Sequence, residues 1–275
     1  ILAALPRQRE AARLTQCRSN LMHIGLALAL YEHRGGKLPA VPPLAELGKT
    51  VRPSPLGAML SELGLDSFGA LKKGKDAPAK QQVNVDLERP VLGFVCPSDP
   101  RATSGLFLAP VSYRACAGDQ PQGQTGAFAP GKTLRVADIE AADGLAYTAA
   151  FAERLVGSGQ NEPGLRNYAI VPGPAGPKAC APQSLSAWRG NAGSSWLGSD
   201  WTSTLYNHTL TPNASPSCAA ADGQSALIGA SSAHSDAVHV LILDGSVRPF
   251  TTRVDPKIWR GLANFHDLPA PAAKP

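Results

Sequence analysis

Apolar side chains recur at alternating steps of three and four residues along the beginning of the chain. This spacing places side chains on one face of an α-helix, and Arg7, Arg9 and Arg13 occupy much of the remaining surface. Gly35 and Gly36 supply a stop signal. We predict one helix from about Leu2 to His33 that packs through a narrow apolar stripe. The stripe consists of Ala11, Leu14, Cys17, Leu21, Ile24, Leu28 and Tyr31.

A second regular pattern lies near the C-terminus. Val238, Val240 and Ile242 alternate with His239, Leu241 and Leu243, which is the period of a β-strand. Asp244 and Gly245 follow, and Ser246–Phe250 returns. Asp-Gly between two such runs indicates a hairpin with a tight two-residue turn of positive φ.

The middle of the chain has shorter and weaker patterns. We predict strands over 91–100 and 112–119, a strand or alternatively a helix over 147–156, a strand or turn over 134–144, and short helices over 55–65 and 256–263. Residues 157–225 are rich in Gly, Pro and Ser and show little periodicity, which predicts a long loop insertion. The predicted organisation is a helix over 1–34, a globular head over 35–269 with the insertion at about 157–225, and a disordered tail over 270–275.

Composition narrows the class of protein. The 275 residues are 43% hydrophobic and only 17% charged, and 27 Gly and 25 Pro predict many turns. The net charge of +5 is dispersed without a long Lys/Arg run, so we expect no nucleic-acid partner. The apolar start, Ile1–Leu5, is too short to span a membrane.

Five cysteines are present, and none forms a C-x-x-C pair, which argues against a zinc ribbon or a thioredoxin-type site. Two disulfides with one cysteine left over fit an oxidising compartment, although the sequence does not fix their connectivity. We expect the pairs Cys96–Cys116 and Cys180–Cys218, with Cys17 free on the helix. Five reduced cysteines packed as small apolar side chains remain the alternative.

Several blocks occur in an order that resembles a known family. His234 is followed by nine residues and then Asp244-Gly245, and upstream lie Phe94–Pro100 (FVCPSDP) and Phe151–Arg154 (FAER). Together with the N-terminal helix they resemble the bacterial prepilin-like, type II secretion pseudopilin-like proteins with a prepilin-type processing-associated His-x-nine-Asp-Gly domain. The further blocks are Leu5–Leu28, Ser112–Gly118, Gly126–Phe128, Arg135–Ile139, Thr204–His208, Pro216–Ala220 and Ile258–Leu262.

The resemblance implies an α+β, pilin-like fold: a long N-terminal helix packed on an antiparallel β-sheet, with long loop insertions. It also implies export of the head to the periplasm or beyond and an inner-membrane anchor before assembly. The anchor would precede Ile1, and we expect that the sequence was trimmed there rather than processed. Partners would then be other pilin-like subunits, engaged through the helix, and the membrane, engaged through the missing segment.

The motif residues invite a metal or acid–base interpretation, which strand geometry opposes. Ten steps of about 3.3 Å put His234 and Asp244 at opposite ends of a strand, up to roughly 33 Å apart. We therefore assign Asp244 and Gly245 to the turn, and His234 to hydrogen bonds at the strand entry with Ser232 or Asp236. A local site that uses His234 and Asp236 stays open.

Two other sets of residues could bind ligands. No cofactor is expected except calcium, which takes oxygen ligands and could use Asp138, Asp143, Asp222 and Asp244, although no Asp-x-Asp-x-Asp spacing is present. Trp196, Trp201 and Tyr206 could form an exposed surface for a sugar or a protein, or could instead pin the predicted loop to the body.

The sequence lacks the G-x-S-x-G motif that holds the nucleophilic serine in many hydrolases, and we expect that the protein is not an enzyme. The expected function is an exported pilin- or pseudopilin-like structural or assembly protein. The alternative is a secreted carbohydrate- or protein-binding module that does not polymerise.

Overall fold

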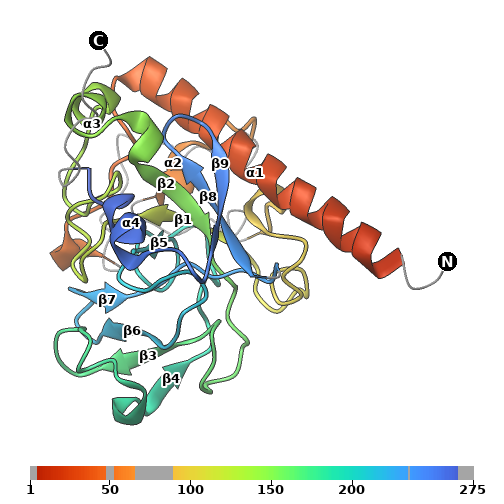
Figure 1. Ribbon diagram of the computed structural model, residues 1–275, viewed down its shortest axis with the longest axis vertical. Coiled ribbons are helices and arrows are strands. Elements are labelled where there is room, and N and C mark those ends of the chain that lie inside the picture. Colours follow the sequence, from red (N-terminus) through yellow and green to blue (C-terminus); the bar gives the residue numbers. More distant parts are fainter. Residues whose placement is uncertain (1–4, 48–52, 66–88, 235, 266–275) are drawn as a thin grey trace, which may run out of the picture.

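The computed structural model describes residues 5–47, 53–65, 89–234 and 236–265, which form an α+β fold of one long helix and two mixed sheets (Figure 1). The expected tail at 270–275 lies outside the described residues. Across the described part of the chain, no helix combines the length and apolarity needed to cross a membrane.

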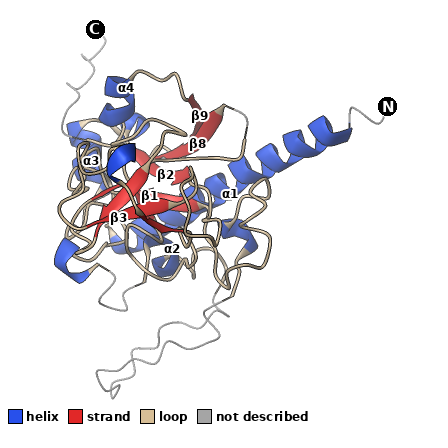
Figure 2. Cartoon of the chain, turned by 90° about the horizontal axis from the view of Figure 1, so that it is seen from below, coloured by secondary structure: helices blue, strands red, loops and turns tan. Residues whose placement is uncertain are grey.

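The long helix α1 runs from Leu5 to Gly35, close to the predicted span. Its predicted stripe is buried at Cys17, Leu21, Ile24 and Leu28, where the helix packs against the sheet. Ala11 is exposed, and the N-terminal turns of the helix extend away from the body (Figures 1 and 2). The prediction is therefore confirmed for the half of the stripe that meets the head.

The first sheet has the strand order β5-β1-β2-β8-β9. Its neighbours pair antiparallel except β1 and β5, which are parallel. Helix α1 crosses β8 closely, since a Cβ at Gly25 would lie 2.9 Å from Leu241 Cδ1. The helix-on-sheet arrangement is thus as predicted, with one parallel edge that the antiparallel expectation did not include. The strands are β1 (Tyr113–Cys116), β2 (Ala149–Glu153), β5 (Leu205–Tyr206), β8 (Ala237–Ile242) and β9 (Val247–Thr251).

The second sheet corrects the prediction of a long loop over 157–225. Its order is β4-β3-β6-β7, with β3 and β6 parallel and the other pairs antiparallel. Each strand has only two to four residues, many of them Ala or Ser, so no period is visible in the sequence. Both sheets contribute to one core, in which Tyr168 and Ala219 join Phe151. The strands are β3 (Tyr168–Val171), β4 (Ala187–Arg189), β6 (Ser217–Ala220) and β7 (Ala226–Leu227).

Short helices replace the strand expected over 91–100 and the strand or turn expected over 134–144. Residues 91–100 hold the 3-10 helix η4 (Leu92–Phe94) and turns, while 134–144 holds α3 (Val136–Ala142). In both segments apolar residues are too few for periodicity to separate a short strand from a helical turn. The remaining helices are α2 (Pro55–Ala58), α4 (Pro256–Gly261), η1 (Leu44–Glu46), η5 (Leu145–Tyr147) and η6 (Pro182–Ser184).

Candidate functional site

A disulfide between Cys17 and Cys96 joins α1 to the segment that follows η4, with Cα atoms 5.3 Å apart. The expected pair Cys96–Cys116 is therefore wrong, and so is the expectation that Cys17 is free. Packing of the α1 stripe on the sheet brings Cys17 to Cys96, whereas Cys116 is the free thiol, buried on β1. Burial raises the pKa of Cys116 to about 12. The pair Cys180–Cys218 forms as expected.

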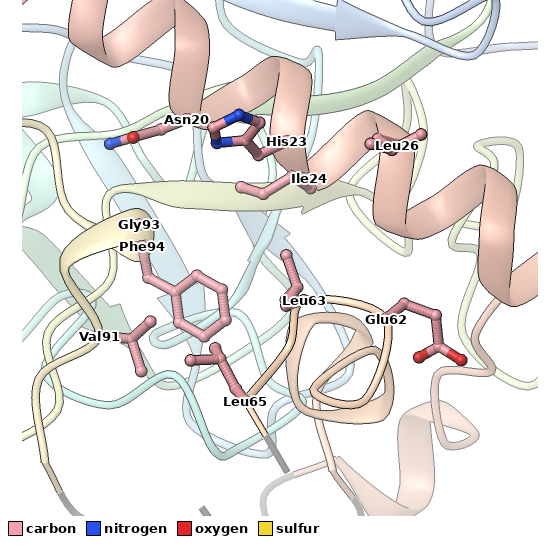
Figure 3. A pocket seen from close by; sticks show the side chains of 10 residues that line it. All are labelled: Asn20, His23, Ile24, Leu26, Glu62, Leu63, Leu65, Val91, Gly93 and Phe94. Atoms are coloured by element: carbon pink, nitrogen blue, oxygen red, sulfur yellow. The ribbon is translucent and has the colours of Figure 1, made fainter. Parts of the chain in front are cut away.

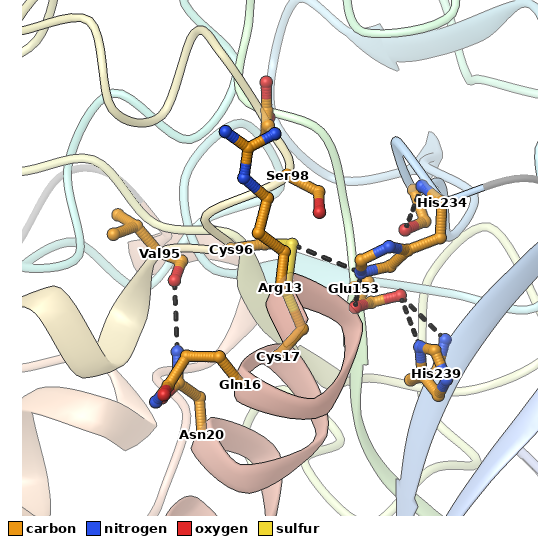
Figure 4. Close-up of a disulfide and its surroundings, with 12 residues drawn as sticks. Arg13, Gln16, Cys17, Asn20, Val95, Cys96, Ser98, Glu153, His234 and His239 are labelled. Atoms are coloured by element: carbon orange, nitrogen blue, oxygen red, sulfur yellow. Dashed lines mark hydrogen bonds and ion pairs between the residues drawn. A yellow bond between two sulfur atoms is a disulfide. The ribbon is translucent and has the colours of Figure 1, made fainter. Parts of the chain in front are cut away.

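His234 lies beside this disulfide at the entry to β8 (Figure 4). Its Nε2 is 3.4 Å from Cys96 Sγ and 3.3 Å from Glu153 Oε1, while its Nδ1 is 2.9 Å from Glu10 Oε1. The backbone N–H of His234 donates to Ser232 Oγ at 3.2 Å, which confirms the Ser232 alternative. Asp236 instead pairs with Arg253 at the surface, so the structure does not bring it to His234.

Glu153, at the end of β2, is the central group of the cluster. Its Oε2 accepts the His239 backbone N–H at 2.8 Å and lies 3.2 Å from His239 Nδ1. Burial acts to raise the pKa of Glu153, but hydrogen bonds from His234 and His239 outweigh it and lower the pKa to about 2. A buried carboxylate therefore sits between two imidazoles at neutral pH.

The pKa of His234 is shifted in the opposite direction, upward. Burial acts to lower its pKa, yet the hydrogen bonds and charges of Glu153 and Glu10 raise it above the usual value. The imidazole of His234 and the carboxylate of Glu153 stabilise each other's charged forms. Because Glu10 belongs to α1, Glu153 to β2 and His234 to the loop before β8, the cluster ties three distant segments together.

Further hydrogen bonds around the cluster hold these groups in position. Ser98 Oγ donates to Glu10 Oε1 at 2.8 Å. On α1, the Asn20 amide donates to Val95 O at 3.1 Å and to Tyr113 Oη at 3.2 Å. These bonds hold α1 and the Cys96 segment in register with the sheet.

The same cluster contains one group of potential metal ligands. Within the described ranges, the ligand atoms of Cys17, Cys96, Glu153 and His234 are the one set of at least three that gathers, all within 4.8 Å of one another. The four calcium candidates form no such set. Asp138 binds Arg135, Asp143 is buried at the end of α3, and Asp222 accepts the Gln224 N–H.

Asp244 and Gly245 lie at the other end of β8, as the strand geometry predicts. Asp244 Oδ1 accepts the Ser246 N–H at 2.8 Å, and its Oδ2 pairs with Arg248 at 2.8 Å. Gly245 has φ +84°, and Asp244 is not among the described residues with positive φ. The connection therefore uses one left-handed residue, where the predicted two-residue turn would need two.

The aromatic surface suggested for Trp196, Trp201 and Tyr206 is absent, because all three side chains are buried. Trp196 Nε1 donates to Arg89 O at 3.0 Å, and Trp201 Nε1 donates to Gly223 O at 3.1 Å. These residues pin the 190–206 segment to the body, which was the alternative interpretation.

A groove of about 340 Å³ lies between α1 and the segments at Leu63 and Phe94 (Figure 3). Its lining is mainly apolar, with Asn20, His23 and Glu62 as the polar members. No cluster of potential metal ligands in the described residues coincides with it.

Sequence reasoning missed Glu10 and Glu153, the two partners of His234. A signal for each existed: Glu10 is the one acidic residue among the arginines of the early helix, and Glu153 is the acidic member of the Phe151–Arg154 block. Their meeting with His234 depends on the tertiary fold.

Comparison with known proteins gives one match. Residues 6–257 match the model of the family described as "Protein of unknown function (DUF1559)", and the chain belongs to this family. Neither curated proteins nor solved structures gave a match.

Proposed function

We propose that this DUF1559-family protein is an exported, non-enzymatic structural subunit of a pilin- or pseudopilin-like assembly, and that α1 is its assembly element. The observation that carries the proposal is the exposed apolar face of α1. Met22, Leu26 and Leu30 are 53%, 61% and 47% exposed, and they follow one another at steps of four residues. Residues at this spacing share one side of a helix.

This exposed face is separate from the buried stripe of α1. One side of the helix is already satisfied by the sheet, so the second apolar side gains nothing in an isolated chain. An aligned, exposed apolar strip is typical of a surface that packs against another protein. In an assembly, the neighbouring subunit would cover Met22, Leu26 and Leu30.

The attachment of α1 to the head supports the same role. The Cys17–Cys96 bridge spans 79 residues of sequence, and closing a loop of that length stabilises a fold by about 4–5 kcal/mol in the chain-entropy account. Glu10, which binds His234, makes a second attachment one to two turns earlier on the helix. A subunit held in an assembly by its helix needs such links to carry its head.

The two disulfides are consistent with an exported protein. Two disulfides are typical of proteins from oxidising, extracytoplasmic compartments. The rival, a secreted binding module, relied on exposed aromatic residues, and the burial of Trp196, Trp201 and Tyr206 leaves it without a supporting observation.

The test compares two single substitutions in the full-length protein expressed in its own cells. Leu26→Arg places a charge on the exposed face of α1, and Ile258→Arg places one on α4, where Ile258 is 63% exposed. We expect filaments or defined oligomers, seen by negative-stain microscopy, for the unchanged protein and for Ile258→Arg but not for Leu26→Arg.

Three outcomes would contradict the proposal. Assembly by Leu26→Arg equal to that of the unchanged protein removes α1 as the assembly element. Monomeric full-length heads with affinity for sugars favour the secreted module. Substrate turnover that is lost on substitution of His234 contradicts a non-enzymatic role.

A further inference from the structure

We propose that the reduced form of this chain binds one zinc-type transition-metal ion through Cys17, Cys96, Glu153 and His234. This site goes beyond the assembly role and does not depend on it. All four residues are buried, and their ligand atoms already lie within 4.8 Å of one another. Two thiolates, an imidazole and a carboxylate are ligands that Zn²⁺ takes in tetrahedral sites, while the two sulfurs exclude a calcium site.

Two of the distances between ligand atoms match a tetrahedral zinc site, and the others are no longer than 4.8 Å. With ordinary zinc–ligand bond lengths, neighbouring ligand atoms are separated by about 3.4 Å for N···O, 3.6 Å for N···S and 3.8 Å for S···S. His234 Nε2 lies 3.3 Å from Glu153 Oε1 and 3.4 Å from Cys96 Sγ. Reduction must also let the two sulfurs separate from their bonded distance.

The surroundings of the imidazole are those of a metal ligand. In protein sites, the histidine nitrogen that does not bind the metal donates to a carboxylate or carbonyl, which fixes the ring and its tautomer. His234 Nδ1 has such a partner in Glu10 Oε1 at 2.9 Å, and Glu10 in turn accepts from Ser98. Nε2 therefore points to the two sulfurs and Glu153 (Figure 4).

Glu153 is oriented in the same way. Its Oε2 is held by the backbone N–H and the ring of His239. Its Oε1 is buried and faces His234 Nε2 at 3.3 Å as an ion pair. A metal ion between these two atoms would satisfy Oε1 and leave every contact of Oε2 in place.

Formation of the metal site begins with reduction of the disulfide. A dithiol reductant transfers two electrons and two protons to the Cys17–Cys96 bond, which breaks to give two thiols while the reductant closes its own disulfide. Zn²⁺ then replaces the two thiol protons, which leave to solvent, because the thiolate is the form that binds metal. Either bond arrangement links α1 to the Cys96 segment.

The second disulfide provides an internal control. Cys180 and Cys218 are also bonded, but no potential metal ligand joins them in a group of three anywhere in the described residues. Reduction frees both pairs of thiols, yet only the Cys17–Cys96 pair has an imidazole and a carboxylate beside it.

The experiment uses the full chain, reduced with dithiothreitol under argon, freed of reductant, incubated with Zn²⁺ and desalted. Bound zinc is counted by elemental analysis. We expect one zinc per chain for the reduced unchanged protein and for Cys180→Ser/Cys218→Ser. We expect none for the oxidised protein or for reduced Cys17→Ser/Cys96→Ser.

A second readout concerns the ligands themselves. Co²⁺ in place of Zn²⁺ should give thiolate charge-transfer bands and the intense visible bands of a tetrahedral site, lost in Cys17→Ser/Cys96→Ser and changed in His234→Gln. Glu10→Gln, which alters a positioning residue, should weaken zinc binding by about 10–100-fold without changing the shape of the Co²⁺ spectrum.

Two results of the zinc analysis would overturn the proposal. One is stoichiometric zinc on Cys17→Ser/Cys96→Ser, and the other is no zinc on the folded reduced chain. If reduction alone unfolds the chain, as judged by near-ultraviolet circular dichroism, added Zn²⁺ should restore the folded spectrum, because an ion that binds only the folded state stabilises it. Failure of Zn²⁺ to restore that spectrum also overturns the proposal.

Discussion

His208 and His234 are both buried, but their surroundings are opposite. His208 follows β5, stacks on Trp259 with ring centroids 3.7 Å apart, and has only neutral partners: Tyr206 Oη at Nε2 and Trp259 O at Nδ1. His234 faces two carboxylates and a disulfide. Burial lowers the pKa of His208 to about 3, with only partial compensation from the Trp259 carbonyl, whereas the carboxylates raise the pKa of His234.

His208 contributes to the packing of an aromatic cluster, whereas His234 links separate segments of the chain through charged contacts. Because Trp259 O can only accept, Nδ1 of His208 must donate and Nε2 must accept from Tyr206, which fixes a neutral tautomer in an aromatic corner. His234 instead makes charged contacts with Glu10 on α1 and Glu153 on β2, beside the Cys17–Cys96 bridge. Two histidines that look alike in the sequence thus contribute to the fold through different physical terms.

The largest expected effect comes from removing the shared carboxylate of the His234 cluster. Glu153→Ala leaves the buried His234 and His239 without their common acceptor, and breaking a buried pair in this way costs about 3–5 kcal/mol. Denaturant titration of the free energy of unfolding measures the loss. The control Glu140→Ala, on the exposed side of α3, should change stability by about 0.5 kcal/mol or less. Equal losses for the two variants would show that Glu153 is not a stabilising centre.

Sequence reasoning reached part of the His234 region. It found the α1 stripe from Cys17 onward, the β8–β9 hairpin and the separate roles of His234 and Asp244, because each rests on local periodicity or on strand length. It did not find Glu10, which contacts His234 across 224 residues of sequence, or the Cys17–Cys96 pairing. Both depend on where α1 docks on the sheet.

The second sheet and the aromatic residues show the other limit. Strands of two to four small residues, such as β6 with its sequence SCAA, carry no visible period, and they pair with strands distant in the sequence. Trp196 is buried against Phe94, and Trp201 Nε1 donates to Gly223 O; both contacts depend on the tertiary fold. For the same reason, nothing in the sequence near His208 predicted its stacking on Trp259.

The next largest effect is on the pH dependence of stability, with opposite signs at the two histidines. The folded-state pKa of His208 is about 3, against 6.5 for an ordinary histidine. Its contribution is complete above pH 6.5 and is lost below it, because the unfolded chain takes up a proton that the folded chain does not. The loss should be about 1.4 kcal/mol per pH unit over the measured range between pH 6.5 and pH 4.5.

The raised pKa of His234 acts in the other window. Its contribution is complete below pH 6.5 and is lost as the pH rises through its folded-state pKa. Unfolding titrations at a series of pH values should therefore show that His208→Asn flattens the acid side and His234→Gln flattens the neutral-to-alkaline side. The carboxyl of Glu153, with its pKa of about 2, adds a further loss only below pH 4.5. If His208→Asn leaves the slope between pH 6.5 and 4.5 unchanged, the neutral state of the buried imidazole is disproved.

A smaller effect is expected from the hydroxyl that satisfies His208. Tyr206→Phe keeps the ring and leaves His208 Nε2 buried without its donor, which should cost about 1–3 kcal/mol of unfolding free energy. The loss should vanish in the His208→Asn background, where the acceptor is gone, so a double-mutant cycle measures the coupling. Additive effects of the two substitutions would contradict a Tyr206–His208 hydrogen bond.

The smallest change in stability is expected on the side of the His234 cluster that faces solvent. Ser98→Ala removes the hydroxyl that donates to Glu10 Oε1 at 2.8 Å, but the Glu10 side chain is 42% exposed, so water can replace the lost donor. We expect a change of about 0.5 kcal/mol or less, measured beside Tyr206→Phe under the same conditions. A loss as large as that of Tyr206→Phe would mean that water reaches the contact between Glu10 and His234 no better than it reaches the buried His208. The contrast between the two histidines would then rest on charge alone, and no longer on access to solvent.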